Sequence, residues 1–191
     1  MQPHPDSHAR LLAAHADMAA GRYESARVAF EDLASRGEMQ ALLYLGWMHE
    51  RGLGGQVDES RAASYYQALC DTGDPVGCYH AASLKFRRRD VSGALELYSR
   101  AAVAGHPSAA YWASAILSGE GGYSRDPERA TYFLTKAASL GHVFACRDLA
   151  KQRLQVAGSV RGKALALLEY CWAVLKGFSI LAKNMDDPRV R

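Results

Sequence analysis

The side chains in this sequence that are best suited to chemistry are four cysteines and seven histidines. A structural zinc site needs four converging ligands with characteristic short spacings, and no four of these residues are grouped in that way. Two glycine-rich segments, at 52–55 and 119–122, are the kind of loop that can hold a phosphate, but no strand pattern precedes either of them. We therefore predict no metal site, no cofactor and no catalytic residue, and we expect both glycine loops to be turns.

Composition is typical of an ordinary folded protein. Apolar residues make up 49% and charged residues 23% of the 191 positions. The formal net charge of +3 is too mild to suggest a phosphate-binding surface, so we do not expect a nucleic-acid partner. No apolar run is long enough to cross a bilayer, and the first 20 residues do not form a secretory signal. We expect a cytoplasmic protein, with the periplasm as the alternative if the start of the chain is a processed end.

The cysteines, histidines and glycine loops lie within a sequence repeat with a period near 36 residues. Glycines recur at positions 37, 73, 105, 141 and 177, and an alanine stands eleven residues before each of them. Seven residues before each glycine is a large side chain, in the order Phe30, Tyr66, Tyr98, Leu134 and Tyr170. These spacings place small and large apolar residues on one stripe of a helix, which the glycine then ends. Self-similarity at this period predicts stacked helix pairs.

The pattern predicts an all-α, right-handed α-solenoid of about five antiparallel helix pairs in a single repeat domain. The hairpins are expected near residues 8–36, 38–72, 75–104, 107–140 and 142–183, followed by a loose polar tail at 184–191. Individual helices are expected at 8–20, 23–36, 38–51, 58–72, 75–88, 91–104, 107–118, 126–140, 142–156 and 162–183. Asp58, Asp90 and Asp126 each precede the repeat alanine by four residues, so we interpret them as helix caps. The loop at Arg87–Arg89 has no glycine pair and is expected to form a tighter turn.

One segment carries the residues of a known repeat family. It reads Ala41-x-x-x-Leu45-Gly46-x-x-His49-x-x-Gly52-x-Gly54, followed by Asp58-x-x-x-Ala62, Tyr65-Tyr66 and Gly73. This resembles the Sel-one-like repeat, a relative of the tetratricopeptide repeat, with histidine at 49 where tyrosine is common. The resemblance covers roughly residues 20–180. It implies a superhelix that binds other proteins through its concave surface and has no catalytic activity of its own.

The resemblance also bears on Cys70 and Cys78. Cysteine-rich bacterial members of the family pair such residues to join adjacent helices, which makes a Cys70–Cys78 disulfide the alternative to two buried free thiols. Cys70 occupies a small-residue position that is alanine in other units, and disulfides are rare in the reducing cytosol. We therefore expect free thiols.

A partner-binding face is predicted on the first helix of each pair, where positions 3, 7, 10 and 14 after the glycine point away from the packed stripe. Aromatic residues and arginines are the usual anchors of protein interfaces. The structural alternative is that Trp47 and Trp112 fill gaps between repeats. The predicted partner-binding residues are Tyr44, Trp47, Arg51, His80, Arg87, Trp112, Asp148 and Lys151.

Charge suggests which kind of partner could bind the last unit. From residue 145 onward there are nine lysines or arginines against four acidic residues, so an acidic partner is plausible there. The run Arg87–Arg89 is interpreted as a solvated loop, with contact to an acidic partner as its alternative.

The predicted function is a non-catalytic adaptor or scaffold that binds one or more proteins, in a bacterial envelope, polysaccharide or secretion system. The first alternative is an immunity protein that neutralises one secreted toxin. The second is a hydrolase with an unrecognised site. Neither metal nor membrane insertion is expected.

Overall fold

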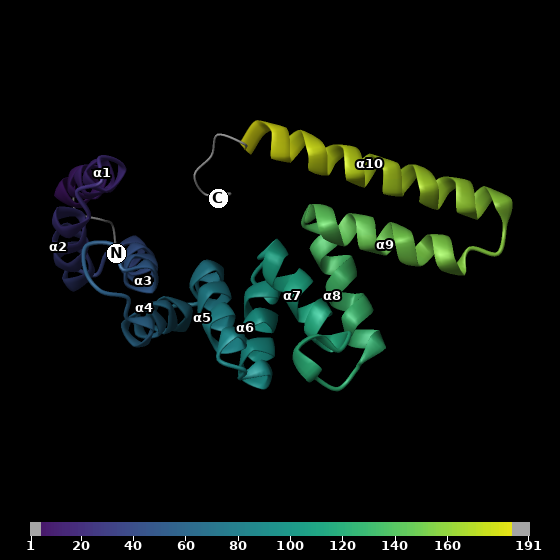
Figure 1. The fold of residues 1–191 in the computed structure, drawn as a ribbon, viewed down its shortest axis with the longest axis horizontal. Helices are drawn as coiled ribbons and strands as arrows, with labels where there is room; N and C mark the ends of the chain where they lie inside the picture. Colours follow the sequence, from purple (N-terminus) through teal and green to yellow (C-terminus); the bar gives the residue numbers. More distant parts are fainter. Residues whose placement is uncertain (1–4, 185–191) are drawn as a thin grey trace. The chain divides into compact units, whose positions relative to one another are not determined.

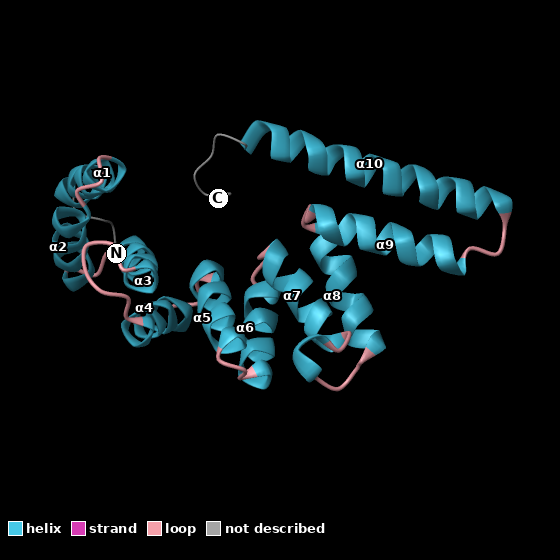
Figure 2. Ribbon diagram, viewed as in Figure 1, coloured by secondary structure: helices cyan, strands magenta, loops and turns pink. Residues whose placement is uncertain are grey.

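The computed structural model describes residues 5–184, and over this range the protein is helical without strands (Figures 1 and 2). The glycine loop at 119–122 includes one short 3-10 segment, η1 (Glu120–Gly122). The described residues form ten α-helices: α1 (Pro5–Ala19), α2 (Tyr23–Ser35), α3 (Met39–Arg51), α4 (Glu59–Asp71), α5 (Pro75–Arg87), α6 (Val91–Val103), α7 (Pro107–Leu117), α8 (Pro127–Ser139), α9 (Val143–Val156) and α10 (Val160–Asn184).

The order of helices gives the predicted five pairs, and an all-α solenoid repeat is confirmed as the fold class. Helix limits agree closely with the predicted ones; the largest difference is at α1, which begins at Pro5 instead of residue 8. The chain divides into two compact units at Leu97, within α6, and each unit is described by itself. The single repeat domain stays a prediction. Apart from Asn184, the predicted polar tail at 184–191 lies outside the described residues.

Local capping chemistry defines the helix starts. Asp58 accepts hydrogen bonds from the backbone N–H groups of Ser60 and Arg61 at 3.1 and 2.9 Å. Asp90 and Asp126 accept from the N–H groups three residues later, at 3.0 and 3.1 Å. These bonds satisfy N–H groups that have no partner inside the helix. The three predicted caps are therefore confirmed.

Two histidines cap helices as well. His106 and His142 precede α7 and α9, and each Nδ1 accepts a hydrogen bond from the N–H three residues later, at 3.1 and 3.3 Å. An imidazole can accept through Nδ1 only while that nitrogen carries no proton. These two histidines therefore serve the repeat itself, in their neutral form.

The turns between pairs require left-handed backbone. Gly37, Gly73, Gly105 and Gly141 have φ between 85° and 94°, which costs glycine little because it has no Cβ. The loop between α5 and α6 achieves the same reversal with Arg89 at φ 66°. The tighter turn predicted there is confirmed, since only three residues separate Arg87 from Val91.

The repeat stripe forms the core. Every alanine eleven residues before a glycine is at least 93% buried, and Phe30, Tyr66 and Tyr98 are buried beside them. Helices α3 and α4 approach closely at Gly46, where an added Cβ would stand 2.5 Å from the Tyr66 ring. Glycine at this position allows the aromatic ring of the following helix to lie directly on the backbone of α3. The repeat alanines are Ala26, Ala62, Ala94, Ala130 and Ala166.

The structure corrects the prediction for the cysteines. Cys70 on α4 and Cys78 on α5 form a disulfide, with their Cα atoms 4.4 Å apart. The expectation of two free thiols is wrong because the turn at Gly73 brings the ends of the two helices within bonding distance. Cys146 occupies the register of Cys78 in a later unit, but its counterpart on α8 is Ala138, and its thiol remains free.

Candidate partner-binding surface

In the first unit, the predicted binding residues on α3 are packed against the molecule to different degrees. Tyr44 is half-buried, with its ring stacked on Phe30 at 4.9 Å and 4.5 Å from His15. Trp47 is half-buried beside the same core, and the guanidinium of Arg51 lies 5.1 Å from the centre of its ring. Tyr44 therefore contributes to packing, whereas Trp47 and Arg51 form an aromatic–cation pair at the surface.

The predicted residues on α5 have partners within the same unit. The ring of His80 stacks on Tyr66 at 4.8 Å, and burial lowers the pKa of His80. Arg87 pairs with Glu50 at 2.6 Å, and Glu50 also accepts a hydrogen bond of 2.9 Å from the Tyr66 hydroxyl. Burial, followed by the charge of Glu50, raises the pKa of Tyr66 far above its usual value. This network connects α3, α4 and α5.

The arginine run also has contacts inside the first unit. Arg88 lies 3.4 Å from the carboxylate of Glu59, and Arg87 is 3.8 Å from the same group. Both arginines are about half exposed, so these pairs add little stability. Two of the three arginines in the run Arg87–Arg89 therefore already lie beside acidic side chains of this chain. An acidic partner was the alternative contact for the same run.

Histidine 49, which departs from the usual tyrosine of the repeat, is a packing residue. It is 7% exposed, its ring stacks on Tyr65 at 5.5 Å, and its Nε2 is buried without a hydrogen-bond partner. Burial is the main reason that its pKa is lowered. A neutral ring at this position avoids the cost of placing a charge in the core.

In the second unit, the predicted residues are distributed differently. Trp112 on α7 is half-buried and stacks on Tyr98 at 6.3 Å, which fits the gap-filling interpretation. Asp148 on α9 accepts a 3.0 Å hydrogen bond from the hydroxyl of Tyr111. Lys151 is exposed on α9. The eight predicted residues fall in both units. Their role as one partner-binding set stays a prediction.

A cluster that the sequence pattern does not predict joins α7 to α9 in the second unit. Its centre is Phe144, which is 53% exposed. The guanidinium of Arg147 lies 5.3 Å from the centre of the Phe144 ring and pairs with Asp148 at 2.7 Å. We call this group the Phe144 cluster; it consists of Tyr111, His142, Phe144, Arg147 and Asp148.

The aromatic rings of the Phe144 cluster contact one another. Tyr111 stacks on His142 at 4.5 Å, and the ring of His142 lies 6.0 Å from Phe144. Hydrogen bonding to Asp148 raises the pKa of Arg147, while burial, followed by the bond to Asp148, raises the pKa of Tyr111. Burial lowers the pKa of His142. The surface is therefore an exposed aromatic ring beside an ion pair.

A sequence signal for the cluster did exist. Phe144 stands three residues after Gly141, on the predicted outward face, where the other units have Gln40, Val76 and Ser108. What the pattern did not reveal was that Arg147 and Tyr111, at other register positions, would gather around it.

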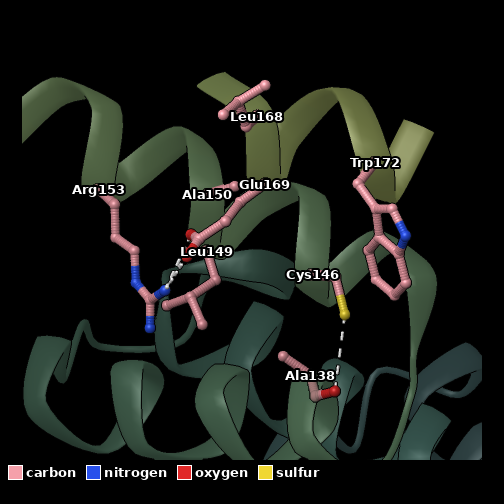
Figure 3. A pocket seen from close by; sticks show the side chains of 8 residues that line it. All are labelled: Ala138, Cys146, Leu149, Ala150, Arg153, Leu168, Glu169 and Trp172. Atoms are coloured by element: carbon pink, nitrogen blue, oxygen red, sulfur yellow. Dashed lines mark hydrogen bonds and ion pairs between the residues drawn. The ribbon is translucent and has the colours of Figure 1, made fainter. Parts of the chain in front are cut away.

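The second unit also contains an apolar cavity of about 410 Å³ between α8, α9 and α10 (Figure 3). Leu149, Leu168 and Trp172 are among the residues that line it, and the Cys146 thiol lies 3.6 Å from the carbonyl oxygen of Ala138. An ion pair of 2.9 Å between Arg153 and Glu169 stands beside it. Both of these charged side chains and the Cys146 residue belong to its lining, together with the apolar residues.

The described part of the chain contains neither a metal-binding group nor a membrane-spanning helix. No group of three or more histidine, cysteine, aspartate or glutamate side chains is arranged there to hold a metal ion. Between residues 5 and 184, no helix is both long enough and apolar enough to span a membrane.

Comparison with solved structures shows the same fold in other proteins. A Sel1 repeat protein from Oxalobacter formigenes is 21% identical, with a TM-score of 0.77 over 91% of this chain and 76% of that one. The protective antigen c5321 of uropathogenic Escherichia coli is also 21% identical, with a TM-score of 0.67. The match covers 84% of this chain and 37% of the antigen chain. MamA matches at 16% identity and a TM-score of 0.58, over 88% of this chain and 96% of that one.

The Sel1 repeat model matches residues 40–74, 76–106 and 107–142, which together exceed half of the chain. These segments correspond closely to the helix pairs α3–α4, α5–α6 and α7–α8. Sel1 repeats are generally protein-interaction modules and typically have no enzymatic activity. The matched repeats, the capped helix pairs and the glycine turns lead to one conclusion: this chain belongs to the Sel1 repeat family.

Proposed function

We propose that this protein is a non-catalytic adaptor that binds a partner protein through the first helices of its repeats. The observation that carries the proposal is the Phe144 cluster, where an aromatic ring that is 53% exposed lies beside the guanidinium of Arg147. Aromatic and arginine side chains dominate the energetics of protein interfaces.

The charge of the cluster indicates the chemistry of the bound segment. Arg147 is neutralised by Asp148, and Tyr111 uses its hydroxyl on the same carboxylate. The most accessible group is therefore the Phe144 ring itself, which suits an apolar side chain of a partner. Trp47 with Arg51 offers a second aromatic–cation pair in the first unit.

The proposal is tested by affinity capture from the native cell with Phe144→Ala, followed by quantitative mass spectrometry. Removing the ring should reduce the recovered partner at least about tenfold, since a buried aromatic anchor contributes 2 kcal/mol or more. Tyr132→Ala is the matched control, because Tyr132 is a similarly exposed aromatic (56%) on α8 of the same unit. Equal losses with both variants, or with neither, would contradict the assignment.

The same capture separates the adaptor from the immunity protein. An adaptor in an envelope, polysaccharide or secretion system should recover two or more proteins with the wild-type chain. A single toxin recovered in a 1:1 complex would establish the neutralising role instead. Turnover of a small substrate without any protein partner would favour the hydrolase.

The compartment is proposed from the cysteines. Disulfides persist in oxidising compartments such as the bacterial periplasm and are rare in the cytosol. The Cys70–Cys78 pairing supports the periplasm over the cytoplasm, the compartment first expected. Rapid alkylation of intact cells, followed by mass spectrometry of residues 62–85, measures the pairing in place. Full alkylation of both cysteines would return the proposal to the cytoplasm.

A further inference from the structure

Helix α10 has apolar side chains on two opposite faces. The covered face includes Ala166, which is 4% exposed, with Tyr170 and Val174 half-buried at successive i+4 positions. The opposite face carries four large apolar side chains that are 59–68% exposed. An apolar helix surface of this size is normally buried against another element. The exposed face, here called the α10 seam, consists of Leu165, Leu168, Trp172 and Leu175.

The spacing of the seam is that of a two-helix contact. Successive members are separated by three, four and three residues, which is the a/d pattern of a coiled coil. A two-fold axis at residue 170 would place Leu165 opposite Leu175 of the other helix, and Leu168 opposite Trp172. Every a position then meets a d position, so the seam is complementary to itself in the antiparallel direction.

The area of the seam reaches the lower limit for a dimer interface. Its four exposed side chains present about 500 Å² of apolar surface, which is near the upper end for the largest patch of a monomer. Two copies would bury about 1,000 Å², the lower limit for a specific interface. The charged residue between Leu165 and Leu175 is Glu169, which pairs with Arg153 of α9 at 2.9 Å. Leu168 and Trp172 also line the cavity between α8, α9 and α10 (Figure 3).

We propose that the α10 seam binds the α10 seam of a second copy of this chain, antiparallel, to form a homodimer. This surface is separate from the Phe144 cluster, which lies on α7 and α9. The dimer would therefore display two copies of the partner-binding surface.

The test is the mass of the full-length protein in solution, measured by size-exclusion chromatography with light scattering over a wide range of concentrations. The wild-type chain should have the mass of a dimer. Leu168→Glu should raise the dissociation constant at least about a hundredfold, because a dimer carries the change twice and each carboxylate is buried without a partner. A wild-type protein that is monomeric at every concentration would overturn the proposal.

Leu167→Glu is the matched control. Leu167 is 51% exposed on the same helix, but it points about 100° away from Leu168 around the axis. This variant should remain dimeric. Circular dichroism should show equal helicity for both variants, since both positions are exposed. If Leu167→Glu dissociates the dimer as strongly as Leu168→Glu, the seam is not the interface.

Direction is tested through Cys171, which is exposed and one residue from the inferred two-fold axis. A short bis-maleimide should join two wild-type chains, and Cys171→Ser should abolish the product. The disulfide removes Cys70 and Cys78 from this reaction. A stable dimer that gives no product through Cys171 would exclude the antiparallel pairing.

Discussion

Reduction of the Cys70–Cys78 disulfide should lower the free energy of unfolding by about 2.5 kcal/mol. The two cysteines are eight positions apart, and in the chain-entropy model closing so short a loop restricts the unfolded chain by about that amount. The bond joins α4 to α5, so its loss removes a covalent restraint between two adjacent repeats. The effect should be visible in the first unit, whose helices α3 to α5 also share the Glu50–Tyr66–Arg87 network.

The assay is urea unfolding followed by circular dichroism, with and without reductant. With a slope near 2–3 kcal/mol per M, the midpoint should fall by about 1 M on reduction. The control is the double variant Cys70→Ala/Cys78→Ala, which should unfold at the reduced midpoint in both buffers. Alanine suits both sites, because Ala102 and Ala110 occupy the same register positions in the next unit and are fully buried. A protein shown by mass to be oxidised, whose midpoint does not respond to reductant, would refute the reasoning.

Three further substitutions test packing, a buried histidine and a helix cap. Gly46→Ala should lower the free energy of unfolding in urea by about 1–2 kcal/mol, although alanine has the better helix propensity, because the new Cβ meets the fully buried Tyr66 ring at 2.5 Å. Gly55→Ala, whose Cβ would meet nothing within 4 Å, should be neutral, and a loss equal to that of Gly46→Ala would argue against the clash. The free energy of unfolding should fall as the pH drops below about 6.5, because the pKa of His80 is lowered in the folded state and the unfolded chain therefore takes up the proton first. His80→Gln should weaken this pH dependence. If the slope of unfolding free energy against pH is the same in the variant, His80 is not its cause. Asp58→Ala should lower the unfolding free energy by about 1 kcal/mol through loss of the cap, whereas an unchanged urea midpoint would show that water replaces the carboxylate at no cost.

The candidate surface was only partly predictable. The outward register of the first helices includes position 144, and Phe144 is exposed there, while gap filling was the stated alternative for the tryptophan of α7. Partners of these side chains were beyond the pattern: Arg87 meets Glu50, 37 positions earlier, and Tyr111 meets Asp148, 37 positions later. Such pairs join helices of different repeats, and their formation depends on side-chain reach and rotamer rather than on spacing along the chain.

What the sequence by itself determined is the repeat architecture: the helix limits, the capping aspartates and the glycine turns. Each of these depends on a few consecutive residues, whose backbone preferences and apolar spacing act locally, and the repetition of one unit makes the signal unambiguous. The tertiary structure decided the rest, namely the Cys70–Cys78 bond, the surroundings of Phe144 and the exposed seam of α10. These features depend on how closely neighbouring helices approach, and that distance is set by the packing of many side chains at once.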